Sequence, residues 1–105
     1  MKTKSPRPID ADKLQEAADM MKAIAHPIRI RIIELLEKYG KLSVGEVMDH
    51  LKVDQAVVSH HVIRMKDRGI LTCEKEGKRR IYNLARPQIT GIIDCISQCQ
   101  ININE

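Results

Sequence analysis

The sequence contains no tryptophan or phenylalanine, and its aromatic side chains are those of Tyr39 and Tyr82. A core without large rings must be built from isoleucine, leucine, valine, methionine and alanine. The shortage also bears on nucleic-acid binding, because proteins that hold single strands stack the bases on aromatic side chains. A protein with two aromatic residues is poorly equipped for that mode of binding.

Two other features are scarce or missing. The three cysteines, Cys73, Cys95 and Cys99, include no CxxC pair, so a disulfide framework or a zinc knuckle is not expected and the thiols should be free. No apolar run approaches the roughly 20 residues of a transmembrane helix, and residues 1–8 lack the apolar segment of a signal peptide. We therefore expect a cytoplasmic protein that does not bind membranes.

The charge of the chain favours an anionic partner. Among 105 residues, 18 are lysine or arginine and 14 are aspartate or glutamate, giving a formal net charge of +4. Because the acids are interspersed with the bases, this is the composition of a folded basic protein and not of a polycationic tail. Nucleic acid is favoured over an anionic membrane, and the shortage of rings favours double-stranded DNA.

Residues 54–69 predict a helix with two different faces. Asp54 is a suitable N-cap for this helix, and Gly69 is a suitable residue just past the C-terminal end of the helix. Val58, Val62 and Met65 form one apolar stripe that must be buried. Another side carries short polar or small side chains that suit the major groove of DNA: Gln55, Ala56, Ser59 and His60, with Arg64, Lys66 and Arg68 behind them.

The preceding segments complete a helix-turn-helix. An amphipathic helix is expected from about residue 10 to 25, with the apolar positions Leu14, Ala17, Ala18, Met21, Ile24 and Ala25. Pro27 then begins a second helix that runs to about residue 39, on which Arg29 and Arg31 either contact phosphates or pair with acids such as Glu34. Ser43 and Glu46 form a capping box for a short third helix, which a tight turn joins to the helix at 54–69.

A β-hairpin follows, in which two short strands between residues 71 and 84 flank Gly77. Four cations gather at its tip, namely Lys75, Lys78, Arg79 and Arg80. Such a run is either a solvated face or the phosphate-contacting wing of a DNA-binding protein, and the position directly after a helix-turn-helix favours the wing. Cys73 is expected to be structural.

The last helix is expected from Pro87 to about residue 100, with Ile89, Ile92, Ile93 and Ile96 on one face. No later segment could cover this stripe, so it and the first helix are predicted to form a homodimer interface. The fold class is therefore mainly α with a small β-hairpin wing, a winged helix-turn-helix that dimerises through its N- and C-terminal helices. Residues 10–100 form the domain, between a disordered basic arm at 1–9 and a tail at 101–105.

In this order of elements, the sequence resembles the ArsR family of winged-helix transcriptional regulators. The resemblance lies in AHPIR at 25–29, in Gln55 with SHHV at 59–62, in GIL at 69–71, and in Gly77 with IYNL at 81–84. It implies a dimeric repressor that leaves its operator when a metal ion, a metalloid or a reactive sulfur or oxygen species binds.

The resemblance also implies roles for individual residues. Gln55, Ser59 and His60 match positions that meet base edges, while His61 lies nearer the buried side and is interpreted as structural. His26 is interpreted as a hydrogen-bonded residue at the joint before Pro27.

The sensing sites of the family are not matched. Two cysteines that bind soft metals at the start of the third helix are replaced here by Ser43 and Gly45. The aspartate and histidines of the zinc site on the terminal helices are replaced by Arg86, Gln88, Cys99 and Asn102.

A thiol function for Cys95 and Cys99 stays an alternative to DNA binding. Four residues apart, they share one helical edge and could hold a soft ion or form a disulfide or polysulfide bridge. They could regulate DNA binding, or DNA contact could be incidental to them, or they could simply pack at an interface. No cofactor is implied, and no nucleophile, paired carboxylates or phosphate-binding loop indicates an enzyme.

Overall fold

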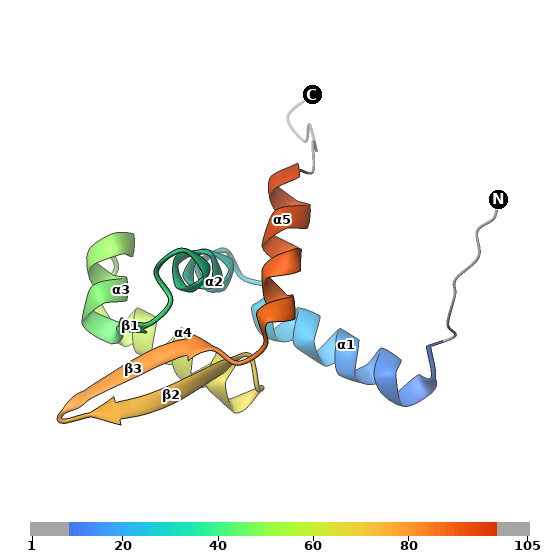
Figure 1. Ribbon diagram of the computed structural model, residues 1–105, viewed down its shortest axis with the longest axis horizontal. Helices are drawn as coiled ribbons and strands as arrows, with labels where there is room; N and C mark the ends of the chain where they lie inside the picture. Colours follow the sequence, from blue (N-terminus) through green and yellow to red (C-terminus); the bar gives the residue numbers. More distant parts are fainter. Residues whose placement is uncertain (1–8, 99–105) are drawn as a thin grey trace.

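The structure, a computed structural model, describes residues 9–98. The predicted mainly helical fold with a hairpin wing is confirmed (Figure 1). The elements are α1 (Ala11–Ile24), α2 (Pro27–Tyr39), β1 (Leu42–Ser43), α3 (Val44–Leu51), α4 (Gln55–Asp67), β2 (Leu71–Glu76), β3 (Arg79–Leu84), the 3-10 helix η1 (Pro87–Ile89) and α5 (Thr90–Gln98). Except for Ile9, the predicted arm and tail lie outside the described residues.

The helices begin where the sequence places their caps. The carboxylates of Asp10 and Asp54 each accept a hydrogen bond from the backbone N–H of the third residue of the following helix. At α3, the hydroxyl of Ser43 accepts from the N–H of Glu46 at 3.1 Å, and the Glu46 carboxylate accepts from the N–H of Ser43 at 2.8 Å. The predicted capping box is therefore confirmed.

The predicted apolar stripe of α4 anchors this helix in the core. Val58, Val62 and Met65 are fully buried. They belong to one cluster with the buried side chains of α2, which are Ile32, Ile33 and Leu36. Since each large side chain buried in this way contributes roughly 1.5–3 kcal/mol, the stripe holds α4 in one orientation.

The wing belongs to a three-stranded antiparallel sheet in the described part of the chain, with strand order β1-β3-β2. The hairpin was predicted, but β1 was not. Leu42 pairs with Tyr82 and Ser43 with Ile81, nearly 40 residues later in the chain. Because Ser43 is both the end of β1 and the N-cap of α3, this pairing joins the wing directly to the helix-turn-helix.

The amphipathic helix predicted at the start of the domain is confirmed as α1, and its apolar residues lie on two sides of the helix. The side towards the core carries Ala23 and Ile24, which are buried, and the partly buried Met20. Leu14 and Met21 are 55% and 62% exposed and lie on a different side. Residues spaced by three or four cover a broad arc of a helix, so the pattern alone did not separate the two faces. In Figure 1, α1 projects away from the remaining elements.

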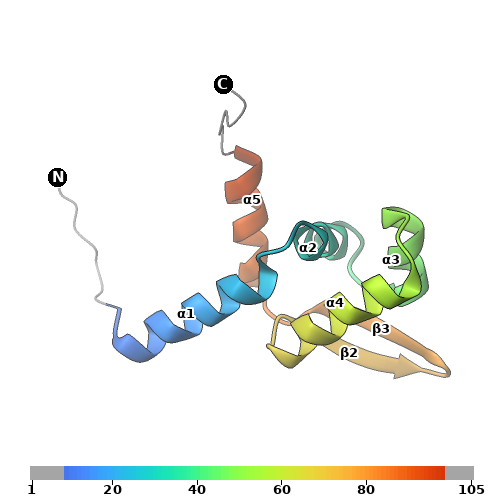
Figure 2. The ribbon, with the colours of Figure 1, turned by 180° about the vertical axis from the view of Figure 1, so that it is seen from behind.

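The predicted isoleucine stripe of the last helix is only partly covered. Ile89 is buried in the 3-10 turn, Ile92 and Ile93 are half-buried, and Ile96 is 46% exposed. α5 stands against α2 (Figures 1 and 2). Between residues 9 and 98, no helix combines the length and the apolar character needed to cross a membrane.

Candidate nucleic-acid interface

The surface of α4 opposite its buried stripe carries the side chains predicted to read DNA. Gln55, Ala56 and His60 are exposed, and Ser59 is half-buried. We call these four residues the reading edge. It begins at the first residue of the helix, where backbone N–H groups and short side chains can approach base edges or phosphates closely.

A groove of about 460 Å³ lies between the reading edge and the hairpin. The groove is lined by Gln55, Ser59 and Ile63 of α4, by Lys78, Arg79, Arg80 and Tyr82 of the hairpin, and by Ser43, Val44 and Gly45 at the start of α3. Figure 2 shows α4 lying along the hairpin. Two predicted groups that are at least 19 residues apart in the chain, with Ser59 and Lys78 as their nearest members in the lining, therefore meet at one surface.

The groove does not include every predicted contact. Ala56, His60, Arg64 and Lys75 are exposed but lie outside its lining. Ile63, in turn, was not predicted from the sequence to lie at this surface, although a signal was available. The buried stripe of α4 is complete without this isoleucine, so an apolar side chain there needed another explanation.

One wing cation is tied to the third helix. The Arg79 guanidinium lies 3.4 Å from the carboxylate of Glu46. The backbone N–H of Ser43 lowers the pKa of Glu46 most, and its hydroxyl and Arg79 lower it further, so Glu46 stays anionic. Within residues 9–98, no ion pair is found for Lys78 or Arg80, so these two offer their charge to a ligand more readily.

The two arginines of α2 have different roles. Arg31 pairs with Glu34, which was one of the two predicted possibilities. Arg29 forms no ion pair with an acid within residues 9–98. Its Nε donates to Nδ1 of His61 at 3.0 Å, and its Nη1 donates to the carbonyl of Ala23 at 2.8 Å. This side chain therefore links the last turn of α1 to the middle of α4.

His61 is held inside the domain, in agreement with its structural interpretation. It is 6% exposed, and its ring lies 4.4 Å from that of His26, which in turn accepts a hydrogen bond from the N–H of Ile28. Burial, reinforced by His26, Arg29 and His60, lowers the pKa of His61 to about 4. The neutral ring accepts at Nδ1, so its proton resides on Nε2.

Of the two candidate sensor cysteines, the structure describes Cys95. Cys95 is exposed on α5, while Cys99 and Asn102 lie outside the described residues. Ser43 is occupied as a helix cap, and Gly45 brings no side chain. Across the described part of the chain, no three histidine, cysteine or acidic side chains gather as metal ligands would.

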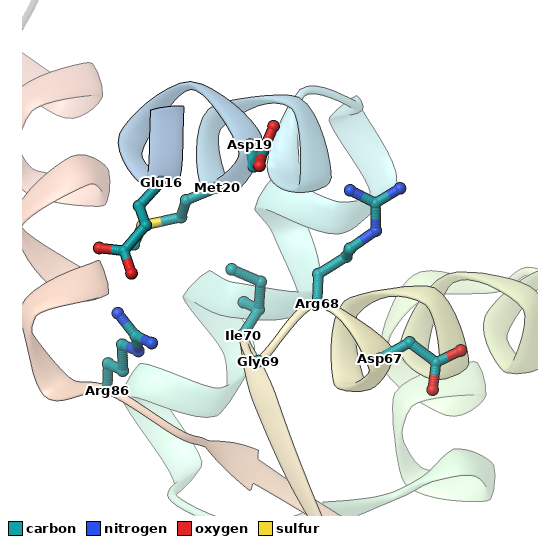
Figure 3. Close-up of a pocket in the computed structure, with 8 residues that line it drawn as sticks. All are labelled: Glu16, Asp19, Met20, Asp67, Arg68, Gly69, Ile70 and Arg86. Carbon is teal, nitrogen blue, oxygen red and sulfur yellow. The ribbon is translucent and has the colours of Figure 1, made fainter. Parts of the chain in front are cut away.

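A second hollow, of about 330 Å³, separates α1 from the junction of α4 and β2 (Figure 3). Glu16 and Arg86 point toward one another across it. Its remaining lining residues are Asp19, Met20, Asp67, Arg68, Gly69 and Ile70. Its lining combines three acids with two arginines, so the hollow presents no field of a single sign to a ligand.

Comparison with known proteins identifies relatives of this chain. The family model described as bacterial regulatory protein, arsR family, matches residues 26–72. An uncharacterised HTH-type transcriptional regulator of Methanocaldococcus jannaschii is 32% identical over 83% of the chain and 98% of its own length. The transcriptional repressor PagR of Bacillus anthracis is 30% identical over 88% of the chain and 92% of its own length.

Solved structures show the same fold. The crystal structure of PagR superimposes with a TM-score of 0.76, covering 83% of this chain and 99% of PagR. A homodimeric winged helix-turn-helix DNA-binding domain from Mycobacterium bovis, 24% identical, superimposes with a TM-score of 0.72 over 92% of this chain and 87% of that domain.

Proposed function

The chain belongs to the arsR family of bacterial regulatory proteins, and from this premise we propose that it is a homodimeric repressor that binds an inverted-repeat operator in double-stranded DNA. The observation that carries the proposal is the shared groove of the reading edge and the hairpin. In the proposed complex α4 lies in the major groove, and the hairpin and α4 contact phosphates through Arg64, Lys75, Lys78, Arg79 and Arg80.

The chemistry of the reading edge fits base recognition. Gln55 can form two hydrogen bonds with adenine, at N6 and N7. Ser59 and His60 can donate to guanine O6 or N7, and Ala56 leaves room for close approach of the helix. Phosphate contacts from the wing fix the register and orientation of the duplex but carry no sequence information themselves.

Dimerisation is supported by the apolar side chains that the monomer leaves exposed. Leu14 and Met21 on α1 and Ile96 on α5 are each at least 46% exposed. The similar domain from Mycobacterium bovis is a homodimer. A twofold dimer would present two copies of α4, so the operator should contain two half-sites about 10–10.5 bp apart, centre to centre.

Selection of bound duplexes from a random pool tests this function. We expect an enriched inverted repeat with that half-site spacing, and a dimer at micromolar concentration. Recovery of unrelated sequences by a monomeric protein would contradict the proposal. Repeating the binding with zinc, arsenite, polysulfide and a thiol oxidant then tests for an inducer, whether a soft metal or a reactive sulfur or oxygen species.

The reading edge should control sequence preference. Replacing Gln55 or His60 with alanine should cost roughly 1–3 kcal/mol of binding free energy for the preferred operator. Operators that already lack the preferred base at the contacted position should lose little affinity, because each side chain meets only one or two base pairs. Affinities for a set of single-base-pair operator variants measure this effect.

The wing should control affinity without regard to sequence. The triple variant Lys78→Ala, Arg79→Ala, Arg80→Ala should bind preferred and random duplexes more weakly by the same factor. The slope of log affinity against log salt should flatten by about 0.9 for every phosphate that the variant no longer neutralises. Gln55→Ala serves as the matched control, since it should leave the salt slope unchanged. If both variants changed specificity alike, the division between reading and phosphate-binding residues would be wrong.

Regulation through Cys95 and Cys99 is a second candidate function, supported by the exposure of Cys95. Operator affinity would then change when the thiols are modified and stay constant in a Cys95→Ser, Cys99→Ser variant.

The regulator we propose needs no cofactor and catalyses no reaction. It would act in the cytoplasm, through a domain at residues 10–100 with a basic arm at 1–9 and a tail at 101–105.

A further inference from the structure

Ile63 is an exposed apolar residue in the middle of the reading face of α4. Its side chain is 49% exposed. At about 100° of rotation per residue, Ile63 falls about 80° around the helix from Gln55. Measured in the same way from Gln55, Ser59 lies at about 40° and Ala56 at about 100°, so Ile63 lies between these two residues. The isoleucine therefore lies within the arc of the reading edge, one turn beyond Ser59.

The surroundings of Ile63 set it apart from the other large apolar side chains that are exposed in the described residues. Those others lie on the N-terminal segment, α1, the end of α2 and α5, and they are Ile9, Leu14, Met21, Tyr39 and Ile96. Ile63 lines the groove between α4 and the hairpin, together with Gln55, Ser59 and Arg80. It is thus the large apolar group on the surface proposed to face DNA.

The major groove displays one apolar group on its base edges, the C5-methyl group of thymine. We propose that Ile63 recognises thymine in the operator by packing against this methyl group. The inference rests on the proposed function, since it requires α4 to lie in the major groove. It adds a specificity determinant that makes no hydrogen bond.

The side chain is suited to this contact. Isoleucine is branched at Cβ, so its χ1 angle is restricted in a helix and little side-chain entropy is lost on binding. A phosphate contact would need a cation, and α4 supplies one in the next residue, Arg64. Ile63 is not needed to hold the helix, because Val58, Val62 and Met65 already anchor it in the core.

Uracil substitution tests the contact directly. Replacing thymine by uracil in the selected operator removes the methyl group and leaves the hydrogen-bonding groups of the base unchanged. For the wild-type protein, uracil at the contacted position should weaken binding about four- to fifteenfold, the effect of losing the burial of one or two methyl groups. Ile63→Ala should bind the thymine operator more weakly by a similar factor and should not distinguish thymine from uracil.

The conservative variant Ile63→Val keeps two methyl groups and should retain most of the discrimination. Because the side chain is exposed, both variants should unfold at the wild-type temperature. If Ile63→Ala distinguished thymine from uracil as well as the wild type does, the proposed contact would be overturned. The proposed function would stand, because the protein would still bind its operator specifically. A wild-type protein that prefers no sequence would overturn the proposed function, and this contact with it.

Discussion

Met21→Glu should convert the protein to a monomer and weaken operator binding by about 10²–10⁴-fold, the avidity that a dimer gains by linking two half-site binding events. Met21 is 62% exposed on the face of α1 that carries Leu14 and is separate from the core-facing Ala23 and Ile24. A carboxylate on this face would have to be buried without a partner in the dimer, whereas the monomer leaves it in water. Sedimentation at micromolar concentration and operator titration measure the two effects.

Gln15→Glu is the matched control for this change. It adds the same negative charge to the same helix, about 100° of rotation away from Leu14, at an exposed position. It should remain a dimer and keep its affinity for the operator to within a small factor. A Met21→Glu protein that stayed dimeric would show that the exposed face of α1 is not the interface. Equal losses in both variants would point to a general charge effect on DNA binding.

The elements of this fold could be predicted because their signals are local. Asp54 and Gly69 mark the two ends of α4, and the spacing of Val58, Val62 and Met65 gives its buried face. These signals depend on residues within a few turns of one another, so no tertiary information is required. The same holds for the Ser43–Glu46 capping box and for the hairpin around Gly77, whose φ angle is +63°.

The features that escaped prediction depend on pairing between distant segments. β1 has two residues, too few for an alternating pattern, and exists because Leu42 and Ser43 pair with β3. Arg29 looked like a surface cation, but its acceptor on His61 lies 32 residues later in the chain. The shared groove was implied only by the order of helix-turn-helix and wing. That Ile63 lines this groove could be seen only once the orientation of α4 was known, and the core fixes that orientation.

The burial of His61 beside His26 and Arg29 should make the fold sensitive to acid. His61 has a pKa of about 4 in the folded protein, against an ordinary value of 6.5. Above pH 6.5 the ring is neutral in both the folded and the unfolded protein, so it makes no pH-dependent contribution to the free energy of unfolding. Between pH 6.5 and 4 the unfolded chain binds a proton that the folded protein excludes, so stability falls as the pH falls. At about 1.4 kcal/mol for each pH unit, the loss should be about 2 kcal/mol at pH 5.

Urea unfolding at pH 7 and pH 5 measures this loss. Glu46, whose pKa is lowered from 4.5, adds acid sensitivity only below this range, so the comparison isolates the histidines. His61→Gln keeps an acceptor for Arg29 and cannot titrate, so its stability should be nearly equal at the two pH values. His50→Gln, an exposed replacement on α3, should keep the wild-type difference.

A second measurement separates His61 from a general effect of the variant on folding. The ring protons of His61, followed by NMR in the wild-type protein, should shift only slightly between pH 7 and pH 5, because a pKa of about 4 leaves about nine-tenths of the rings neutral at pH 5. A shift centred near pH 6.5 would contradict the assignment. When protonation does occur it places a cation against Arg29 and beside His26 and His60. Acid would therefore loosen α4 from the α1–α2 junction, at the turn of the helix that also carries the reading edge.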